Sequence, residues 1–215
     1  MLDTHFLRPL GDVGNPDSWP FPVLIERVGG AFAQPVVSGT YAGIGSFIEA
    51  GQRLVERGAC ALTTTCGFLV RHQRALETAL AVPVCASSLS SYGALQQKLG
   101  KSRQVAILTI DKAALDSLVR EAAGIPDDAL IFDLPSASHF RGAILDAAFP
   151  LDPQTAEDEW VSLARSVQRA RPKIGQWLFE CANMPPYAGA VASATGLPVY
   201  DALDVGNALY RSVQP

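Results

Sequence analysis

Cys66 and Cys181 are the residues of this sequence whose type and placement could do chemistry. Each follows a short, apolar, strand-like run, and each is followed by a helix-like segment and then a Pro-Val pair. The offset from cysteine to proline is the same in both stretches, since 83 − 66 = 17 and 198 − 181 = 17. An amphipathic helical pattern precedes both. The sequence therefore indicates one helix-strand-Cys-helix-strand unit that occurs twice.

Two thiols placed in this way suggest proton transfer at carbon. A thiol between the end of a strand and the start of a helix is close to the positive end of the helix dipole, so we expect a lowered pKa for both cysteines. One thiolate could remove a proton from a carbon next to a carboxylate while the other thiol returns one from the opposite face. The negative charge that develops would be held by the backbone N–H groups that follow each cysteine, those of Gly67, Phe68, Ala182 and Asn183.

Strand-like and helix-like segments alternate nearly throughout, which predicts an α/β fold with parallel sheets covered by helices on both faces. The duplicated unit predicts two pseudosymmetric, flavodoxin-like lobes: residues 1–88 with 199–215 would carry Cys66, and residues 89–198 would carry Cys181. In such sheets ligands bind at the carboxyl ends of the strands. Both cysteines lie there, so we expect the active site in the cleft between the lobes. Strands are expected at Phe21–Val28, Ala59–Thr65, Val82–Ala86, Gln104–Ile110, Ala129–Leu134, Ile174–Glu180 and Leu197–Tyr200.

Composition limits the partners. With 215 residues, 48% of them hydrophobic and 18% charged, the chain is expected to be a soluble globular protein. A net charge of −4 without a cluster of basic residues argues against nucleic acid and anionic membranes, and no apolar run approaches membrane-spanning length. We expect a cytoplasmic protein with a small-molecule ligand. The first residues predict either a very short strand or a start that lies upstream.

The four cysteines form neither a disulfide framework nor a spacing typical of zinc ligands. We therefore expect free thiols and no metal. Cys60 and Cys85 lie within expected strands and are assigned to core packing. Arg8 opens a long loop and could bind a second carboxylate, whereas Glu180 is expected to point away from the side chain of Cys181 because side chains alternate along a strand.

The stretches around both cysteines resemble the aspartate/glutamate racemase superfamily, which also includes hydantoin racemases, maleate isomerases and arylmalonate decarboxylases. The matching residues are Thr64-Thr65-Cys66-Gly67-Phe68, Glu180-Cys181-Ala182-Asn183-Met184-Pro185-Pro186-Tyr187 and Gly196-Leu197-Pro198-Val199-Tyr200-Asp201. The resemblance implies two flavodoxin-like lobes, a homodimer, and proton transfer between Cys66 and Cys181 without a cofactor. It also matches Asp3 and Thr4 to acidic and hydroxyl residues beside the first cysteine.

The sequence departs from that family where a substrate carboxylate would bind. Gly67-Phe68 stands where those racemases carry Asn-Thr, and Ala182-Asn183 stands where they often carry Thr-His or Thr-Glu. Backbone donors together with serine or threonine hydroxyls would have to replace these side chains. The expected substrate-binding residues are Asp3, Thr4, Thr65, Gly67, Phe68, Ser87, Thr109, Ala182 and Asn183.

The leading hypothesis is a cofactor-independent racemase or epimerase that acts on a small carboxylate such as aspartate, glutamate or a related compound, with Cys66 and Cys181 as the acid/base pair. A second hypothesis keeps the fold and changes the reaction to decarboxylation or cis-trans isomerisation of a small dicarboxylate. A third is a carboxylate-binding protein without activity.

Overall fold

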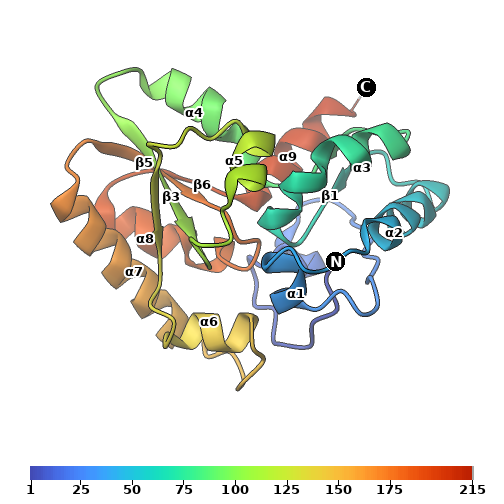
Figure 1. Cartoon of the computed structure of the whole chain (residues 1–215), viewed down its shortest axis with the longest axis horizontal. Helices are drawn as coiled ribbons and strands as arrows, with labels where there is room; N and C mark the ends of the chain where they lie inside the picture. The colour runs from blue at the N-terminus through green and yellow to red at the C-terminus, as the bar shows by residue number, and fades with distance from the viewer. Residues whose placement is uncertain (215) are drawn as a thin grey trace.

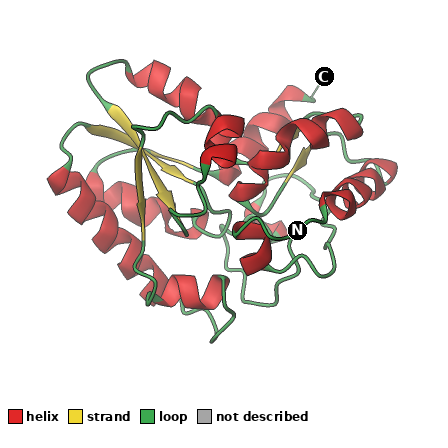
Figure 2. Ribbon diagram, viewed as in Figure 1, coloured by secondary structure: helices red, strands yellow, loops and turns green. Residues whose placement is uncertain are grey.

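Two parallel sheets form the framework of the protein, and the computed structural model describes them within residues 1–214 (Figures 1 and 2). The larger sheet has the strand order β4-β3-β5-β6. Its central strands are nearly continuous apolar runs, as expected for strands with both faces covered. The strands are β3 (Gln104–Thr109), β4 (Leu130–Asp133), β5 (Ile174–Phe179) and β6 (Val199–Tyr200).

The smaller sheet pairs β1 (Leu62–Thr63) with β2 (Val84–Cys85), again in parallel. Both strands are much shorter than the sequence predicted. The backbone of Leu2 approaches β1 but donates its N–H to the hydroxyl of Thr65, so no further ladder forms there. The expected strand Phe21–Val28 is an irregular segment, and Val28 donates a hydrogen bond to the carbonyl of Met1.

Helices cover the sheets and connect their strands (Figure 2). The long α7 begins where Asp152 accepts a hydrogen bond from the Thr155 amide and Pro153 occupies the first turn. The α-helices are α1 (Ala33–Val37), α2 (Ile44–Glu56), α3 (Gln73–Ala79), α4 (Tyr92–Leu99), α5 (Ser117–Ala123), α6 (His139–Ile144), α7 (Pro153–Ala170), α8 (Ala188–Thr195) and α9 (Ala202–Ser212). The 3-10 helices are η1 (Pro16–Ser18), η2 (Gly67–His72), η3 (Ser88–Ser91) and η4 (Pro185–Tyr187).

The duplicated unit predicted from the sequence is present, with matching register in the two sheets. Leu62 pairs with Val84 and Trp177 with Val199, so the separation is 22 residues in both cases (84 − 62 and 199 − 177). The amide of Leu62 donates to the carbonyl of Pro83 at 2.9 Å, and the amide of Trp177 donates to that of Pro198 at the same distance. The α/β class with two lobes is therefore confirmed.

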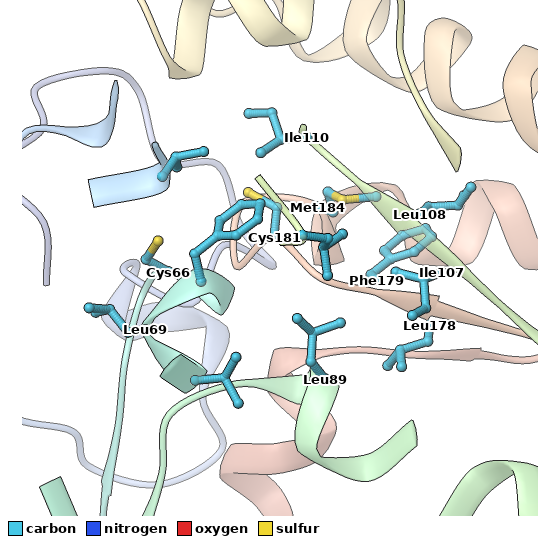
Figure 3. Close-up of a cluster of buried hydrophobic side chains, with 14 of the residues drawn as sticks. Cys66, Leu69, Leu89, Ile107, Leu108, Ile110, Leu178, Phe179, Cys181 and Met184 are labelled. Atoms are coloured by element: carbon cyan, nitrogen blue, oxygen red, sulfur yellow. The ribbon is translucent and has the colours of Figure 1, made fainter. Parts of the chain in front are cut away.

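One hydrophobic cluster runs through both lobes and fixes their mutual position. Figure 3 shows Leu89 beside Leu178 and Phe179 of β5, with Leu69 near Cys66 on the other side of the same cluster. Trp177 is also fully buried, and truncation of such a side chain to alanine costs about 3–5 kcal/mol. The elements that carry the two cysteines thus belong to one rigid core.

Some boundaries differ from the expectation. The helix expected to follow Cys66 is split into η2 and α3. α1 had no clear periodic signal and was missed. β6 pairs with β5 in the larger sheet, although the predicted second lobe ended at residue 198. The lobe boundaries themselves stay a prediction.

Within residues 1–214, no helix combines the length and apolar character needed to cross a lipid bilayer.

Candidate active site

A small pocket lies where the two lobes meet, and both Cys66 and Cys181 contribute to its wall. It is narrow: the empty space of about 340 Å³ includes the gaps between the wall atoms and the opening to solvent. The wall is mostly apolar, with a few polar side chains. Its residues are Leu2, Thr4, Phe6, Arg8, Ala33, Val37, Thr65, Cys66, Phe68, Ile110, Ile144, Leu145, Glu180, Cys181 and Asn183.

Cys66 enters this pocket from the first lobe, and Cys181 enters it from the second (Figure 3). Cys66 has an extended backbone, directly precedes η2, and its amide donates to the Thr64 hydroxyl at 3.3 Å. Cys181 lies two residues after the end of β5. Both side chains are buried. The prediction that the duplicated unit brings the two thiols to one site agrees with this placement.

The pKa values of the two thiols are shifted in the direction opposite to the expectation. Burial raises the pKa of the Cys66 thiol to about 12, and the nearby Glu180 carboxylate contributes to this rise as the second cause. Burial and Glu180 also raise the pKa of Cys181. The expected lowering was wrong because the helices that follow are short 3-10 turns, which carry little dipole, and because a carboxylate was not anticipated. In the free protein both cysteines are neutral thiols at neutral pH.

A chain of polar contacts connects Cys181 to the N-terminal loop. The thiol of Cys181 donates to Asn183 Oδ1 at 3.5 Å, and Asn183 Nδ2 donates to Asp12 Oδ2 at 2.7 Å. Asp12 Oδ1 in turn accepts a hydrogen bond of 2.7 Å from the Arg8 guanidinium. Arg8 also donates to the Thr4 hydroxyl at 2.6 Å. Arg8 is thereby held at the wall of the pocket as its cationic residue.

Glu180 is a site residue that sequence reasoning missed. Its side chain lines the same pocket as both thiols, whereas strand alternation had predicted that it points away from the cysteine. The alternation rule did not apply because β5 ends at Phe179. Only 1% of the residue is exposed, and burial raises the pKa of its carboxyl to about 7. The hydrogen bond from Thr109 opposes this rise.

The glycine after the first cysteine makes room for this carboxylate. A Cβ atom added to Gly67 would overlap both the carbonyl oxygen and Oε1 of Glu180. Any larger side chain at this position, such as the asparagine of the racemases, would therefore displace Glu180. The departure from the racemase sequence at Gly67 and the buried carboxylate at Glu180 are two parts of one arrangement.

The predicted binding residues divide into two groups. Thr4, Thr65, Phe68 and Asn183 line the pocket with the cysteines. The others do not line its wall: Asp3 accepts from the Gly30 amide, Ser87 caps η3, Thr109 donates to Glu180, and Gly67 and Ala182 lie beside the cysteines in the chain. Arg8 was noted from its place in the loop. Nothing in the sequence pattern indicated Asp12.

The two remaining cysteines are free thiols away from the pocket. Cys60 is exposed, which contradicts its assignment to the core, because β1 begins only at Leu62. Cys85 is half-buried in β2. Among the residues that the structure describes, no three His, Cys, Asp or Glu side chains gather in a group that could hold a metal ion.

A larger groove lies elsewhere, between the segment Trp19–Glu26, the start of β1 and α9. Its empty volume is about 1390 Å³, but it contains neither Cys66 nor Cys181. Since it lacks the cluster of two thiols and a carboxylate found in the smaller pocket, the pocket between the lobes is the candidate active site.

Sequence comparison finds relatives along nearly the whole chain. The chain is 31% identical over 209 residues to a protein named dimethylsulfoniopropionate lyase from Durusdinium sp. clade D, which covers 94% of this chain and 69% of that protein. It is 29% identical over 226 residues to dimethylsulfoniopropionate lyase 3 of Emiliania huxleyi (strain CCMP1516), with coverage of 99% and 58%. The chain thus spans between about three fifths and two thirds of these relatives. No family model matches it.

Structure comparison finds the fold of the aspartate/glutamate racemase family. A mutant of arylmalonate decarboxylase in a sulfate-associated form superimposes with a TM-score of 0.62 and 18% identity, over 96% of this chain and 88% of that one. A glutamate racemase from Bacillus anthracis superimposes with a TM-score of 0.52 and 11% identity, over 82% and 65%. The fold implied by the sequence resemblance is confirmed. The names of the sequence relatives favour a lyase over the expected isomerase.

Proposed function

Because the chain belongs to the dimethylsulfoniopropionate lyase family, we propose that it cleaves dimethylsulfoniopropionate, or a close analogue, by elimination. The observation that carries this proposal is the meeting of Cys66 and Cys181 in one pocket that also contains Arg8. The substrate is a carboxylate with a good leaving group, so removal of a proton next to the carboxylate leads directly to loss of dimethyl sulfide.

The proposed reaction begins with the step expected of a racemase. A thiolate takes the proton from the carbon next to the carboxylate, and the electron pair of that C–H bond forms a carbon-carbon double bond. The C–S bond breaks, and its pair leaves on sulfur as dimethyl sulfide. Acrylate remains, and the proton held by the cysteine is later lost to water. No redox partner or cofactor is needed for this balance.

The charges of the pocket fit such a substrate. Arg8 would bind the carboxylate, and a guanidinium there would stabilise the negative charge that develops during proton removal. The raised pKa of both thiols disfavours thiolate in the free protein. A sulfonium cation that enters the pocket would lower those pKa values by direct charge attraction. Substrate binding would thus help to generate the base.

The proposal is tested by measuring dimethyl sulfide in the headspace above the protein and dimethylsulfoniopropionate. We expect release by the wild type and a loss of more than about 100-fold in Cys66→Ser or Cys181→Ser, since general base catalysis contributes factors of this order. Cys60→Ser is the matched control, because this thiol is exposed and does not line the pocket. Equal release by all four proteins would refute the assignment.

Racemisation remains a second candidate, favoured by one observation. Elimination needs a single base, whereas the pocket holds two thiols that come from equivalent positions of the two lobes. Incubation of the protein with single enantiomers of aspartate and glutamate, followed by chiral chromatography, tests this function. Racemisation without release of dimethyl sulfide would favour it over the lyase.

A further inference from the structure

The two carboxylate oxygens of Glu180 differ in their hydrogen bonding within residues 1–214. Oε2 accepts hydrogen bonds from the Thr109 hydroxyl at 2.9 Å and from the Ile110 amide at 3.4 Å. Oε1 is buried beside the Gly67 backbone, which helps to lower the pKa of the carboxyl, but within residues 1–214 no donor completes a hydrogen bond to this oxygen. The carboxylate is thus held firmly from one side, and its other oxygen belongs to the wall of the pocket between the lobes.

Within residues 1–214, the cations beside the pocket pair with carboxylates other than Glu180. Arg71, which acts on Cys66, lies 3.9 Å from Asp116. Arg8 is paired with Asp12, and Arg141 is paired with Asp111 and Asp133 while it also donates to the Ile110 carbonyl. Within residues 1–214, Glu180 itself forms no ion pair. The titratable groups that face it are the two thiols and Asp111, and each of them is neutral or negative.

A buried carboxylate without a cation is expensive, because removal of a charge from water must be offset by pairing. Such groups are retained where a ligand supplies the missing charge. We propose that Glu180 is the anionic partner of the ligand's cationic group, so that the pocket takes a short zwitterion with a carboxylate at Arg8 and a sulfonium or quaternary ammonium group at Glu180. This inference rests on the proposed function and specifies the part of the site that recognises the cation.

The other walls of the pocket suit an alkylated cation. Phe6, Phe68, Ile144 and Leu145 surround the polar groups with apolar surface. Methyl groups on sulfur or nitrogen cannot donate hydrogen bonds, so they are recognised by apolar and aromatic contact together with a nearby negative charge. A primary ammonium would instead leave donors without acceptors in this apolar wall. The pocket therefore selects onium compounds over amino acids.

The test uses two ligands of equal shape. One is trimethylammonio-propionate, in which a poor leaving group prevents cleavage, and the other is its neutral isostere, with a tert-butyl group in place of the trimethylammonium group. In isothermal titration calorimetry at about pH 8.5, we expect the wild type to bind the cation about 30-fold or more tightly than the isostere. Glu180→Gln should abolish this preference, and the preference should fall about tenfold between pH 8 and pH 6 as Glu180 is protonated.

Thr109→Val provides a second variant that keeps the carboxylate. Removal of the Thr109 hydroxyl withdraws a hydrogen bond that lowers the pKa of Glu180, so the pH at which the preference is half lost should rise. Equal affinity of the wild type for both ligands, or no binding of either, would overturn the inference, as would a preference that survives in Glu180→Gln. Release of dimethyl sulfide with an unchanged KM in that variant would overturn the inference while the lyase function stands. Cation preference in a protein that releases no dimethyl sulfide would overturn the lyase function while the inference stands.

Discussion

The side-chain amide of Asn183 donates a hydrogen bond of 2.7 Å to Asp12, which precedes it by 171 residues. Both residues are buried. Through this bond the loop that carries Arg8 is fixed to the residue two positions after Cys181. The pocket between the lobes is therefore closed on one side by the N-terminal loop, and the position of its cation depends on a carboxylate that does not itself line the wall.

Asp12→Ala tests this connection. The substitution leaves the half-buried Arg8 without its carboxylate and the buried Asn183 without an acceptor, so we expect a loss of about 3 kcal/mol in the free energy of unfolding. Urea denaturation measures it. Asp17→Ala, in the same loop but exposed, should stay within about 0.5 kcal/mol of the wild type. A similar small change in both variants would show that the connection is unimportant.

The raised pKa values of Cys66 and Cys181 predict slow alkylation of the free protein. Because only thiolate reacts, the rate at Cys66 should rise about tenfold per pH unit up to about pH 10 without reaching a plateau. Mass spectrometry of tryptic peptides after iodoacetamide treatment follows each thiol separately. The exposed Cys60 should be modified first. A plateau at Cys66 below about pH 9 would mean that the thiol is activated in the free protein.

Glu180→Gln should alter how stability depends on pH. The pKa of Glu180 is raised on folding from 4.5 to about 7, so the folded state binds the extra proton and the wild type loses stability as pH rises through this window. The shift of 2.5 pKa units (7 − 4.5) corresponds to about 3 kcal/mol at about 1.36 kcal/mol per unit, most of it between pH 5 and pH 8. Glutamine cannot ionise, so this loss is absent from the variant. Between pH 5 and pH 8 the free energy of unfolding of Glu180→Gln should therefore rise by this amount relative to that of the wild type.

Urea midpoints at the two pH values give this comparison. Glu49→Gln, an exposed residue of α2, serves as the control and should follow the wild type. Parallel pH profiles for Glu180→Gln and the wild type would contradict a buried carboxyl that titrates near neutrality.

Gly67→Ala should disturb the pocket specifically. The added methyl group overlaps the main chain and side chain of Glu180, so we expect a loss of about 1–3 kcal/mol in stability and a large loss of cleavage activity. Gly189→Ala in α8 is the matched control, since no heavy atom lies within 4 Å of its added Cβ. Thermal unfolding and dimethyl sulfide release measure both effects. Full activity of Gly67→Ala would show that Glu180 can move without consequence.

The sequence predicted the framework of the site and its two thiols because these depend on a repeated local pattern. Cys66 and Cys181 follow equivalent strands, and the register of Leu62 with Val84 matches that of Trp177 with Val199. Such an arrangement needs no information about distant contacts.

The remaining site residues depend on contacts that a local pattern does not contain. Asp12 and Arg8 belong to an irregular loop without periodicity, and Arg8 is held at the pocket by contacts with Thr4 and with Asp12, which Asn183 binds in turn. Glu180 was misjudged because the alternation of a strand was extended one residue beyond the end of β5. The direction of the thiol pKa shifts was wrong for the same reason, since it depends on burial and on Glu180.

The most direct test of the central claim is proton NMR of the protein with dimethylsulfoniopropionate in D₂O, beside parallel samples with aspartate and glutamate. We expect vinyl signals of acrylate and the methyl signal of dimethyl sulfide to grow together, at a rate that depends on Cys66 and Cys181, with no change in the amino acid samples. Loss of the α-proton signal of an amino acid, without acrylate in the first sample, would contradict the lyase and identify a racemase.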